Sequence, residues 1–270
     1  MRIGISFAMA DPAGLSRTRL VEDAQLIEQM GFHGQWFFDA LGRGGILPDP
    51  LIALTTAACA TERLEVGTCV LQVPLRRAAE LAHRVLTAHL IAEGRMAFGV
   101  GAGSTATDFQ LVGVDFEDRL RQLDESLDVM QALWRGETVN DVSLTPWPAT
   151  IGGPPILIGS WSGSVWIPRA AQEFDGWIAS GAKTSFNTLA GGIERFRSAG
   201  GKRAIVTNVA IDLDASTEAL PDDGPFHLRC APDEARRRFQ RLADLGFDDC
   251  IFVLPDRNQA RLNAIRDLMS

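Results

Sequence analysis

Short apolar segments alternate with longer amphipathic segments along the chain. A short apolar run between turn residues is typical of a buried strand, whereas apolar residues spaced three or four apart indicate a helix. The clearest helix is predicted over Phe116–Trp134, where one apolar stripe is closed by Gly136. The other predicted helices are Leu15–Met30, Leu51–Glu62 after Asp49-Pro50, Ala78–Glu93, Ser164–Phe174, Phe186–Ser198, Pro232–Leu245 and Gln259–Met269. The predicted strands are Arg2–Ala8, Gly34–Asp39, Leu64–Gln72, Met96–Gly101, Pro155–Gly159, Gly176–Gly181, Arg203–Asp212 and Asp248–Leu254.

The strict alternation of these strands and helices favours a parallel sheet. Eight strand–helix units in 270 residues match the size of a (β/α)8 barrel, and an open doubly wound sheet is the alternative. Because no low-complexity linker divides the chain, we expect a single domain over residues 1–270. Two irregular segments, Glu137–Pro154 and Leu213–Pro232, are predicted to be insertions over one end of the barrel.

Composition narrows the class of protein. Hydrophobic residues make up 46% and charged residues 22% of the chain, which predicts a sizeable core rather than disorder. The net charge of −8 argues against nucleic acid or an anionic membrane as the main partner. No apolar run approaches the roughly 20 residues of a membrane helix, and the N-terminus is expected to be a strand rather than a signal peptide. The scattered cysteines and histidines predict no metal site and fit a cytoplasmic location.

A glycine-rich turn follows the fourth predicted strand. Gly101–Ala106 matches the G-x-G-x-x-A fingerprint of dinucleotide-binding folds, with acidic residues about 20 positions further on. That fingerprint requires a helix that opens inside the turn, whereas Gly113 is expected to interrupt any helix here and the next helix to begin near Phe116. The motif therefore indicates the end of a barrel strand where glycines let a flat ligand approach the backbone. Crowding inside the barrel is an alternative reason for the glycines.

Several segments match one family pattern in order. They are Gly34–Asp39, Val66–Arg76, Glu93–Phe109, Val112–Trp134, Pro155–Trp177 and Ala231–Glu234. Together they resemble the luciferase-like monooxygenase family, the bacterial luciferase superfamily of flavin- and deazaflavin (F420)-dependent oxidoreductases. The resemblance covers nearly the whole chain and implies a (β/α)8 barrel with shortened insertion segments. It also implies a homodimer that acts on a small-molecule substrate.

The resemblance implies a site for FMN or coenzyme F420 at the carboxyl-end mouth of the barrel, and the third- and fourth-strand patterns slightly favour F420. The cofactor ring is expected to lie against a bulge with a non-prolyl cis peptide bond at Cys69–Val70. The pyrimidine side and ribityl chain would contact Gly101, Gly103 and Thr107, with Asp39 facing the polar edge. The loop after the fifth strand would hold the phosphate with Gly159, Ser160, Ser162, Gly163 and Ser164.

The resemblance leaves the reaction open. The catalytic residue is unassigned, with Asp39, Ser104 and Asp108 as candidates, and Asp39 equally suits a loop or helix cap. Relatives place charged or titratable side chains where this chain has Ala40, Ala102 and Ser104. A flavin- or F420-dependent oxidoreductase or monooxygenase is the preferred function, and a cofactor-binding or partner subunit with reduced catalysis is the alternative. A hydrolase or aldolase lacks a nucleophile motif, although Lys183 follows the sixth strand. Arg43 is a further candidate for binding a carboxylate or phosphate.

Overall fold

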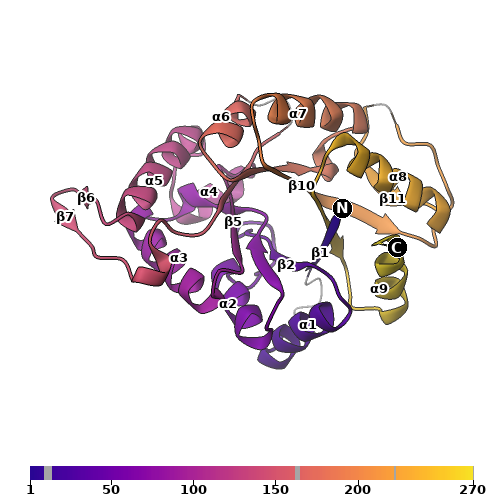
Figure 1. The fold of residues 1–270 in the computed structure, drawn as a ribbon, viewed down its shortest axis with the longest axis horizontal. Helices are drawn as coiled ribbons and strands as arrows, with labels where there is room; N and C mark the ends of the chain where they lie inside the picture. Colours follow the sequence, from indigo (N-terminus) through magenta and orange to yellow (C-terminus); the bar gives the residue numbers. More distant parts are fainter. Residues whose placement is uncertain (9–13, 162–164, 222, 270) are drawn as a thin grey trace.

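A closed ring of parallel strands forms the centre of the molecule (Figure 1). The computed structural model describes residues 1–8, 14–161, 165–221 and 223–269. Parallel pairing of the first and last strands, from Arg2 opposite Asp249 to Phe7 opposite Leu254, closes the ring. The predicted barrel is therefore confirmed, and the open doubly wound sheet is wrong because such a sheet has two free edges. The barrel strands are β1 (Arg2–Phe7), β2 (Gly34–Phe37), β3 (Glu65–Thr68), β5 (Met96–Gly101), β8 (Ile156–Gly159), β9 (Gly176–Ser180), β10 (Arg203–Asp212) and β12 (Asp249–Leu254).

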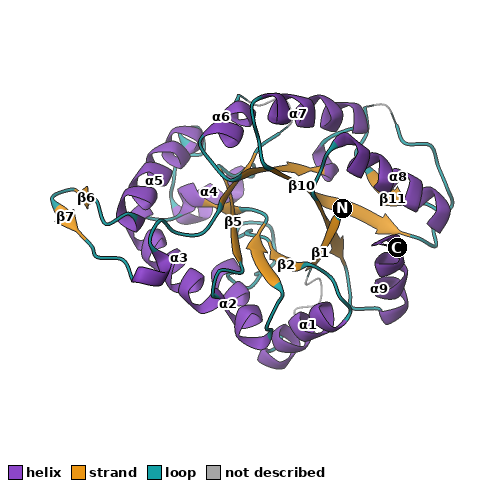
Figure 2. Cartoon of the chain, viewed as in Figure 1, coloured by secondary structure: helices purple, strands orange, loops and turns teal. Residues whose placement is uncertain are grey.

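Helices surround this ring (Figure 2). Local capping fixes several of their starts: the Asp49 carboxylate accepts the amides of Leu51 and Ile52, and Pro50 occupies the first turn of α2. None of the helices in the described ranges has both the length and the apolar character needed to cross a bilayer. The helices are α1 (Arg17–Gln29), α2 (Pro50–Ala60), α3 (Ala78–Ala92), α4 (Ala106–Val112), α5 (Arg119–Trp134), α6 (Trp166–Gln172), α7 (Phe186–Ser198), α8 (Pro232–Leu245) and α9 (Gln259–Arg266).

The third predicted strand is interrupted. β3 ends at Thr68, and β4 (Leu71–Gln72) resumes the pairing with β5. The peptide bond between Cys69 and Val70 is cis, at the position predicted from the sequence. The second predicted strand also ends earlier than expected, so Asp39 lies in the loop beyond β2.

A short helix follows the glycine-rich turn. The expectation that no helix opens there is wrong, because α4 begins at Ala106 and ends where Gly113 adopts φ 71°. Phe109 anchors this helix: its side chain is fully buried and its ring lies 5.2 Å from that of Phe116. α5 consequently begins at Arg119 rather than at Phe116. The dinucleotide-binding interpretation still fails, because the turn follows the fourth strand of a closed barrel.

The two irregular segments differ in position. Glu137–Pro154 connects α5 to β8 and therefore lies on the amino-end side of the strands. Its antiparallel hairpin, β6 (Thr138–Val139) with β7 (Val142–Ser143), extends away from the barrel (Figure 1), so the prediction that this segment covers the barrel is wrong. Leu213–Pro232 instead contains β11 (His227–Arg229), which pairs in parallel with the last residues of β10 at the carboxyl end.

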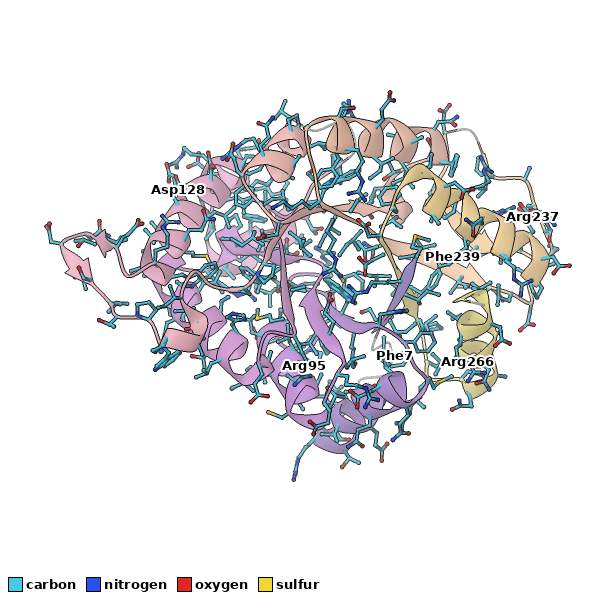
Figure 3. All side chains as sticks on the ribbon, in the orientation of Figure 1. Phe7, Arg95, Asp128, Arg237, Phe239 and Arg266 are labelled. Atoms are coloured by element: carbon cyan, nitrogen blue, oxygen red, sulfur yellow. The ribbon has the colours of Figure 1, made fainter. Side chains whose placement is uncertain are left out.

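The barrel interior is a packed core (Figure 3). Trp36 is its largest residue and is 2% exposed. A Cβ atom placed on Gly4 or Gly67 would lie only 2.6 Å or 2.5 Å from the Trp36 indole, so both strands need glycine there. The rest of this interior cluster is Cys69, Ala97, Leu157, Ile178, Ile205 and Ile251.

Substitution of Gly67 tests this packing. Gly67→Ala should lower the free energy of unfolding by about 1–3 kcal/mol, because the new methyl group overlaps the Trp36 ring. Gly191→Ala is the matched control, since Gly191 lies in α7 with no atom within 4 Å of the added Cβ. This control should raise stability by up to about 1 kcal/mol. Urea unfolding measures both, and equal stability of Gly67→Ala and wild type would contradict the packing.

Candidate active site

The mouth of the barrel is lined by small and polar residues. Side chains alternate along a strand, so residues two positions beyond the interior core share its inward face. By this register, Gly159 follows Leu157, Ser180 follows Ile178, and Thr207 follows Ile205. The large apolar side chains of the interior therefore give way, at the carboxyl ends of the strands, to a layer of small side chains. Barrel active sites lie at this end.

Val70 is packed between two of the predicted cofactor-binding glycines. A Cβ atom on Gly101 would lie 2.8 Å from Val70 Cγ2, and one on Gly159 would lie 2.5 Å from Val70 Cγ1. Crowding is thus one reason for both glycines, and for Gly101 this agrees with the alternative interpretation of the sequence. The structure brings Val70, Gly101 and Gly159 together from β5, β8 and the interrupted third strand into one apolar surface.

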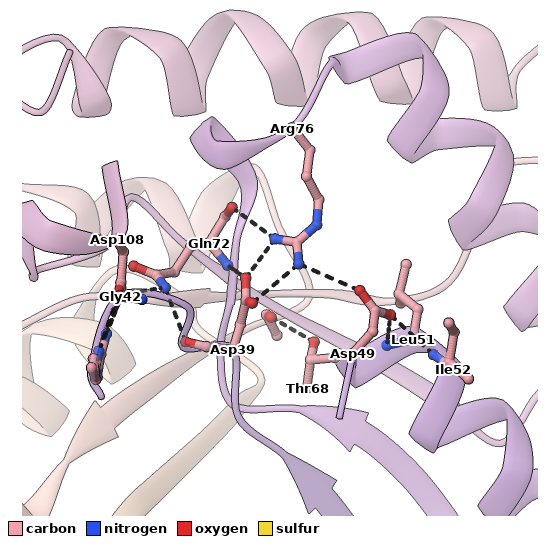
Figure 4. A network of polar contacts seen from close by, with 11 residues as sticks. Asp39, Gly42, Asp49, Leu51, Ile52, Thr68, Gln72, Arg76 and Asp108 are labelled. Carbon is pink, nitrogen blue, oxygen red and sulfur yellow. Dashed lines mark hydrogen bonds and ion pairs between the residues drawn. The ribbon is translucent and has the colours of Figure 1, made fainter. Parts of the chain in front are cut away.

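Asp39 is held in an ion pair at this mouth (Figure 4). Its Oδ2 accepts from Arg76 Nη1 at 2.5 Å and from the backbone N–H of Gln72 at 2.8 Å. Its Oδ1 accepts from Arg76 Nη2 at 3.1 Å. Burial lowers the pKa of Arg76, but the carboxylates of Asp39 and Asp49 raise the pKa above its usual value. Asp39 is therefore a buried partner of a charged arginine and caps no helix.

Asp108 is anchored in the same way. The carboxylate accepts from Arg43 Nη2 at 2.7 Å, from Gln72 Nε2 at 2.8 Å and from the Gly42 amide at 2.8 Å. Burial raises the pKa of Asp108, but these hydrogen bonds outweigh it and hold the pKa below its usual value. Arg43, considered from the sequence as a ligand for a carboxylate or phosphate, here binds a carboxylate of its own chain. The contact ties the loop after β2 to the start of α4.

Gln72 links the two carboxylates and retains an unused acceptor. Its Nε2 also donates to the Asp39 carbonyl at 2.9 Å, while its buried Oε1 has no hydrogen-bond partner within the described residues. Gly103, at φ 85°, admits this side chain, since a Cβ there would lie 2.5 Å from Oε1. The buried hydroxyl of Ser160 is likewise without a partner in the described part. Unpaired buried polar atoms are rare and fit a mouth that receives polar groups of a ligand.

The remaining candidates are placed less tightly. Ser104 and Thr107 are exposed at the start of α4. Burial raises the pKa of the Cys69 thiol to about 12, although a hydrogen bond with the Thr207 hydroxyl lowers the pKa by a smaller amount. This thiol is therefore inert at neutral pH. Ser162, Gly163 and Ser164 lie outside the described residues.

Three residues of the mouth had no role in the sequence analysis. Gln72 and Arg76 lie inside the matched segment Val66–Arg76, and their polar character next to an apolar strand was an available signal. Asn208 adopts φ 56° where the register of β10 shifts, and its Nδ2 donates to Ser180 Oγ at 3.3 Å. Bulges of this kind are common beside active sites, but nothing in the sequence marks this one.

The parallel (β/α)8 barrel, with buried polar groups gathered at its carboxyl-end mouth, defines the architecture of a barrel enzyme. The chain belongs to the luciferase-like monooxygenase family, because the family model of that description matches residues 1–220. The family predicted from the sequence is therefore confirmed.

Individual relatives are more distant. The chain is 30% identical over 163 residues to 4-hydroxyprotoasukamycin monooxygenase of Streptomyces nodosus subsp. asukaensis, a match that covers 56% of this chain and 44% of that protein. The chain thus spans less than half the length of this curated relative.

Two solved structures share the whole fold. An F420-dependent secondary alcohol dehydrogenase in complex with an F420–acetone adduct has a TM-score of 0.76 at 14% identity, over 99% of this chain and 97% of that chain. The FMN complex of the type II Baeyer–Villiger monooxygenase that is the oxygenating constituent of 3,6-diketocamphane monooxygenase, from the CAM plasmid of Pseudomonas putida, also has a TM-score of 0.76. It is 17% identical over 100% of this chain and 97% of that chain.

The Asp108 ion pair predicts a pH-dependent stability. Because the folded pKa lies below the unfolded value of about 3.9, the ionised carboxylate contributes its full stability above about pH 4 and loses it as the pH falls through the folded pKa. Asp108→Asn should lower the free energy of unfolding by about 1–3 kcal/mol at pH 7. That difference should shrink as the pH falls from 4 toward 2.

Urea unfolding across this pH range measures the effect. Asp128→Asn is the control, because Asp128 is exposed on the outer face of α5 (Figure 3) and its loss should change stability by less than about 0.5 kcal/mol. A stability difference for Asp108→Asn that stays constant from pH 7 to pH 2 would refute the assigned ionisation.

Proposed function

We propose that the protein is an oxidoreductase that binds F420 or FMN at the carboxyl-end mouth and acts on a small organic substrate there. The network joining Asp39, Gln72 and Asp108 carries the proposal. Both carboxylates form ion pairs with arginines, so they are suited to holding charge and position. Family membership supports a redox group as the source of the chemistry.

The residues at the mouth fit such a group. Val70 with the Gly101 and Gly159 backbones offers an apolar surface for a planar ring, and Gln72 Oε1 offers an unused acceptor for a ring N–H. Gly103 and Thr107 would border the ring and its chain, and the loop from Ser160 through residues 162–164 would receive the phosphate. When bound, a reduced deazaflavin supplies a hydride, and a reduced flavin with oxygen supplies an oxygen atom. Of the two, the VGTCVLQVPLR and GVGAG segments favour F420.

A binding titration tests the proposal. Reduced F420 or reduced FMN should quench tryptophan fluorescence with a dissociation constant in the micromolar range, about −8 kcal/mol. Gly101→Ala should weaken that binding about tenfold, because the new Cβ displaces Val70 from the ring surface. Gly191→Ala, which changes a residue in the outer helix α7, should bind the cofactor as wild type does.

Absence of binding by either cofactor, reduced or oxidised, would refute the proposal. Tight binding without turnover across aldehydes, ketones and alcohols would instead support a cofactor-binding subunit. The neutral residues Ala40, Ala102 and Ser104 favour that second function.

The proposed enzyme is a cytoplasmic homodimer that binds neither nucleic acid nor membrane. Its four cysteines are free, which fits a reducing compartment, and the net charge of −8 disfavours polyanions. α2 and α3 pack against each other, and their outer faces expose Ile52, Cys59, Leu90 and Ile91. α2 carries no charged side chain, which is unusual for a helix facing solvent and supports its burial against a second copy.

Sedimentation velocity tests the dimer. Ile52 is 68% exposed, so Ile52→Lys should leave the fold intact while placing a charge in the interface. The wild type should sediment as a dimer of the 29.3 kDa chain and the variant as a monomer. A monomeric wild type, or a dimer that the substitution leaves unchanged, would contradict this interface.

A further inference from the structure

A large cavity lies at the opposite end of the barrel from the mouth. Its volume is about 630 Å³, within the range of small-molecule sites. It is lined by the first residues of β1, β3, β5 and β10, by the loops that precede β2, β3, β5 and β8, and by Glu28 of α1. Trp36 lies between this amino-end cavity and the mouth, with the guanidinium of Arg203 5.9 Å from its ring centre. A ligand in the cavity would therefore be separate from anything bound at the mouth.

The lining of the amino-end cavity is positively charged in an acidic protein. It contains the arginines Arg2, Arg63, Arg95 and Arg203 and the glutamates Glu28 and Glu65. The four arginines outnumber the two glutamates, although the whole chain carries a net charge of −8. Such an excess at a concave surface attracts anions.

Two of these arginines are neutralised by a ring of ion pairs. Glu65 receives Arg2 Nη2 at 2.7 Å and Arg203 Nη2 at 2.7 Å. Asp249, behind the cavity wall, receives Arg203 Nε at 2.9 Å and Arg2 Nε at 3.4 Å. Two arginines and two carboxylates balance in this ring, so Arg63 and Arg95 remain against Glu28 and leave an excess of one positive charge.

Arg95 is fixed in place by neutral acceptors only. Its Nη1 donates to Thr61 Oγ1 at 3.2 Å and to the Leu64 carbonyl at 3.1 Å, and its Nη2 donates to the Ala58 carbonyl at 2.9 Å. Figure 3 labels this residue. These bonds orient the guanidinium and leave its charge without a carboxylate partner within the described ranges.

Arg63 and His33 add donors to the same cavity. The exposed Arg63 guanidinium makes no hydrogen bond or ion pair to the described part of the chain, although its charge acts on Glu28, which accepts three backbone amides through Oε1. His33 Nδ1 accepts the Ile3 amide at 3.2 Å, so Nε2 carries the proton. Burial and then Arg2 lower the pKa of His33, so this side chain is a neutral donor at pH 7.

We propose that the amino-end cavity is a second ligand site, one that binds a small molecule bearing a phosphate monoester. A phosphate monoester carries nearly two negative charges at neutral pH and three acceptor oxygens. The excess positive charge on the lining attracts such an anion, and the oxygens match the donors of Arg63, Arg95 and His33. The site does not depend on the oxidoreductase function proposed for the mouth.

Inorganic phosphate is the probe that tests this site. The full-length protein is titrated with phosphate at pH 7.5 and constant ionic strength, and binding is followed by the broadening of the ³¹P resonance. Arg63→Gln removes the charge at an exposed position, while the hydrogen bond from the backbone N–H of residue 63 to Glu28 Oε1 remains. Arg63→Glu reverses the charge. Arg17→Gln is the matched control, because Arg17 is an exposed arginine at the mouth end of α1.

Wild type should bind phosphate saturably, and Arg63→Gln should weaken the affinity about tenfold, with a larger loss in Arg63→Glu. Arg17→Gln should bind as wild type. Binding that neither Arg63 variant alters would place the phosphate away from this cavity and overturn the proposal. Absence of saturable binding would also overturn it.

Discussion

The parallel pairing of β1 with β12 is the contact on which the rest of the structure depends. It joins six residue pairs without a shift in register and turns an open sheet into a ring. Closure directs the carboxyl ends of all barrel strands to one rim and leaves an interior that side chains must fill. Trp36 fills the part of that interior next to the amino-end cavity, because Gly4 and Gly67 make room for its indole. The molecule thereby gains two ends that are separated by a packed layer.

The two ends differ in how their charges are arranged. At the mouth, Arg43 and Arg76 neutralise Asp108 and Asp39, and Gln72 joins the two pairs into one network. This network fixes the loop after β2, the interrupted third strand and α4 relative to one another. It therefore provides position and charge balance, and leaves the reaction to a bound group. At the amino end, the ion pairs balance only part of the charge, and the arginines left over face a cavity.

Much of the fold is predictable from the pattern of apolar residues. β5, β10, α7 and α8 have the predicted bounds, because β5, β10 and α8 begin or end at a glycine, proline or charged residue and α7 begins after the N-cap Ser185. α4 was missed because seven residues are too few to show a helical period, and its stability comes from burial of Phe109 rather than from its own sequence. The insertion Glu137–Pro154 was misplaced because the sequence shows an insertion without showing its direction.

The mouth is predictable only in part. Family segments located the cis peptide bond and brought Asp39, Gly101 and Gly159 to one rim. The family segments did not show that arginines neutralise both carboxylates, because each arginine is distant in sequence from its partner. Arg43 pairs with Asp108 across 65 positions, and Arg76 pairs with Asp39 across 37 positions. The hydrogen bonds of Gln72 to Asp39 and Asp108 were also not predictable, because they depend on the break in the strand after Thr68.

Hydrogen–deuterium exchange with and without reduced cofactor tests the central claim most directly, since it reports where the cofactor acts on the backbone. The account predicts slower exchange at residues 69–72 and 99–103 and unchanged exchange at residues 62–65 beside the amino-end cavity. Slower exchange confined to residues 62–65, or no change at 69–72 while the cofactor is bound, would contradict a cofactor site at the mouth.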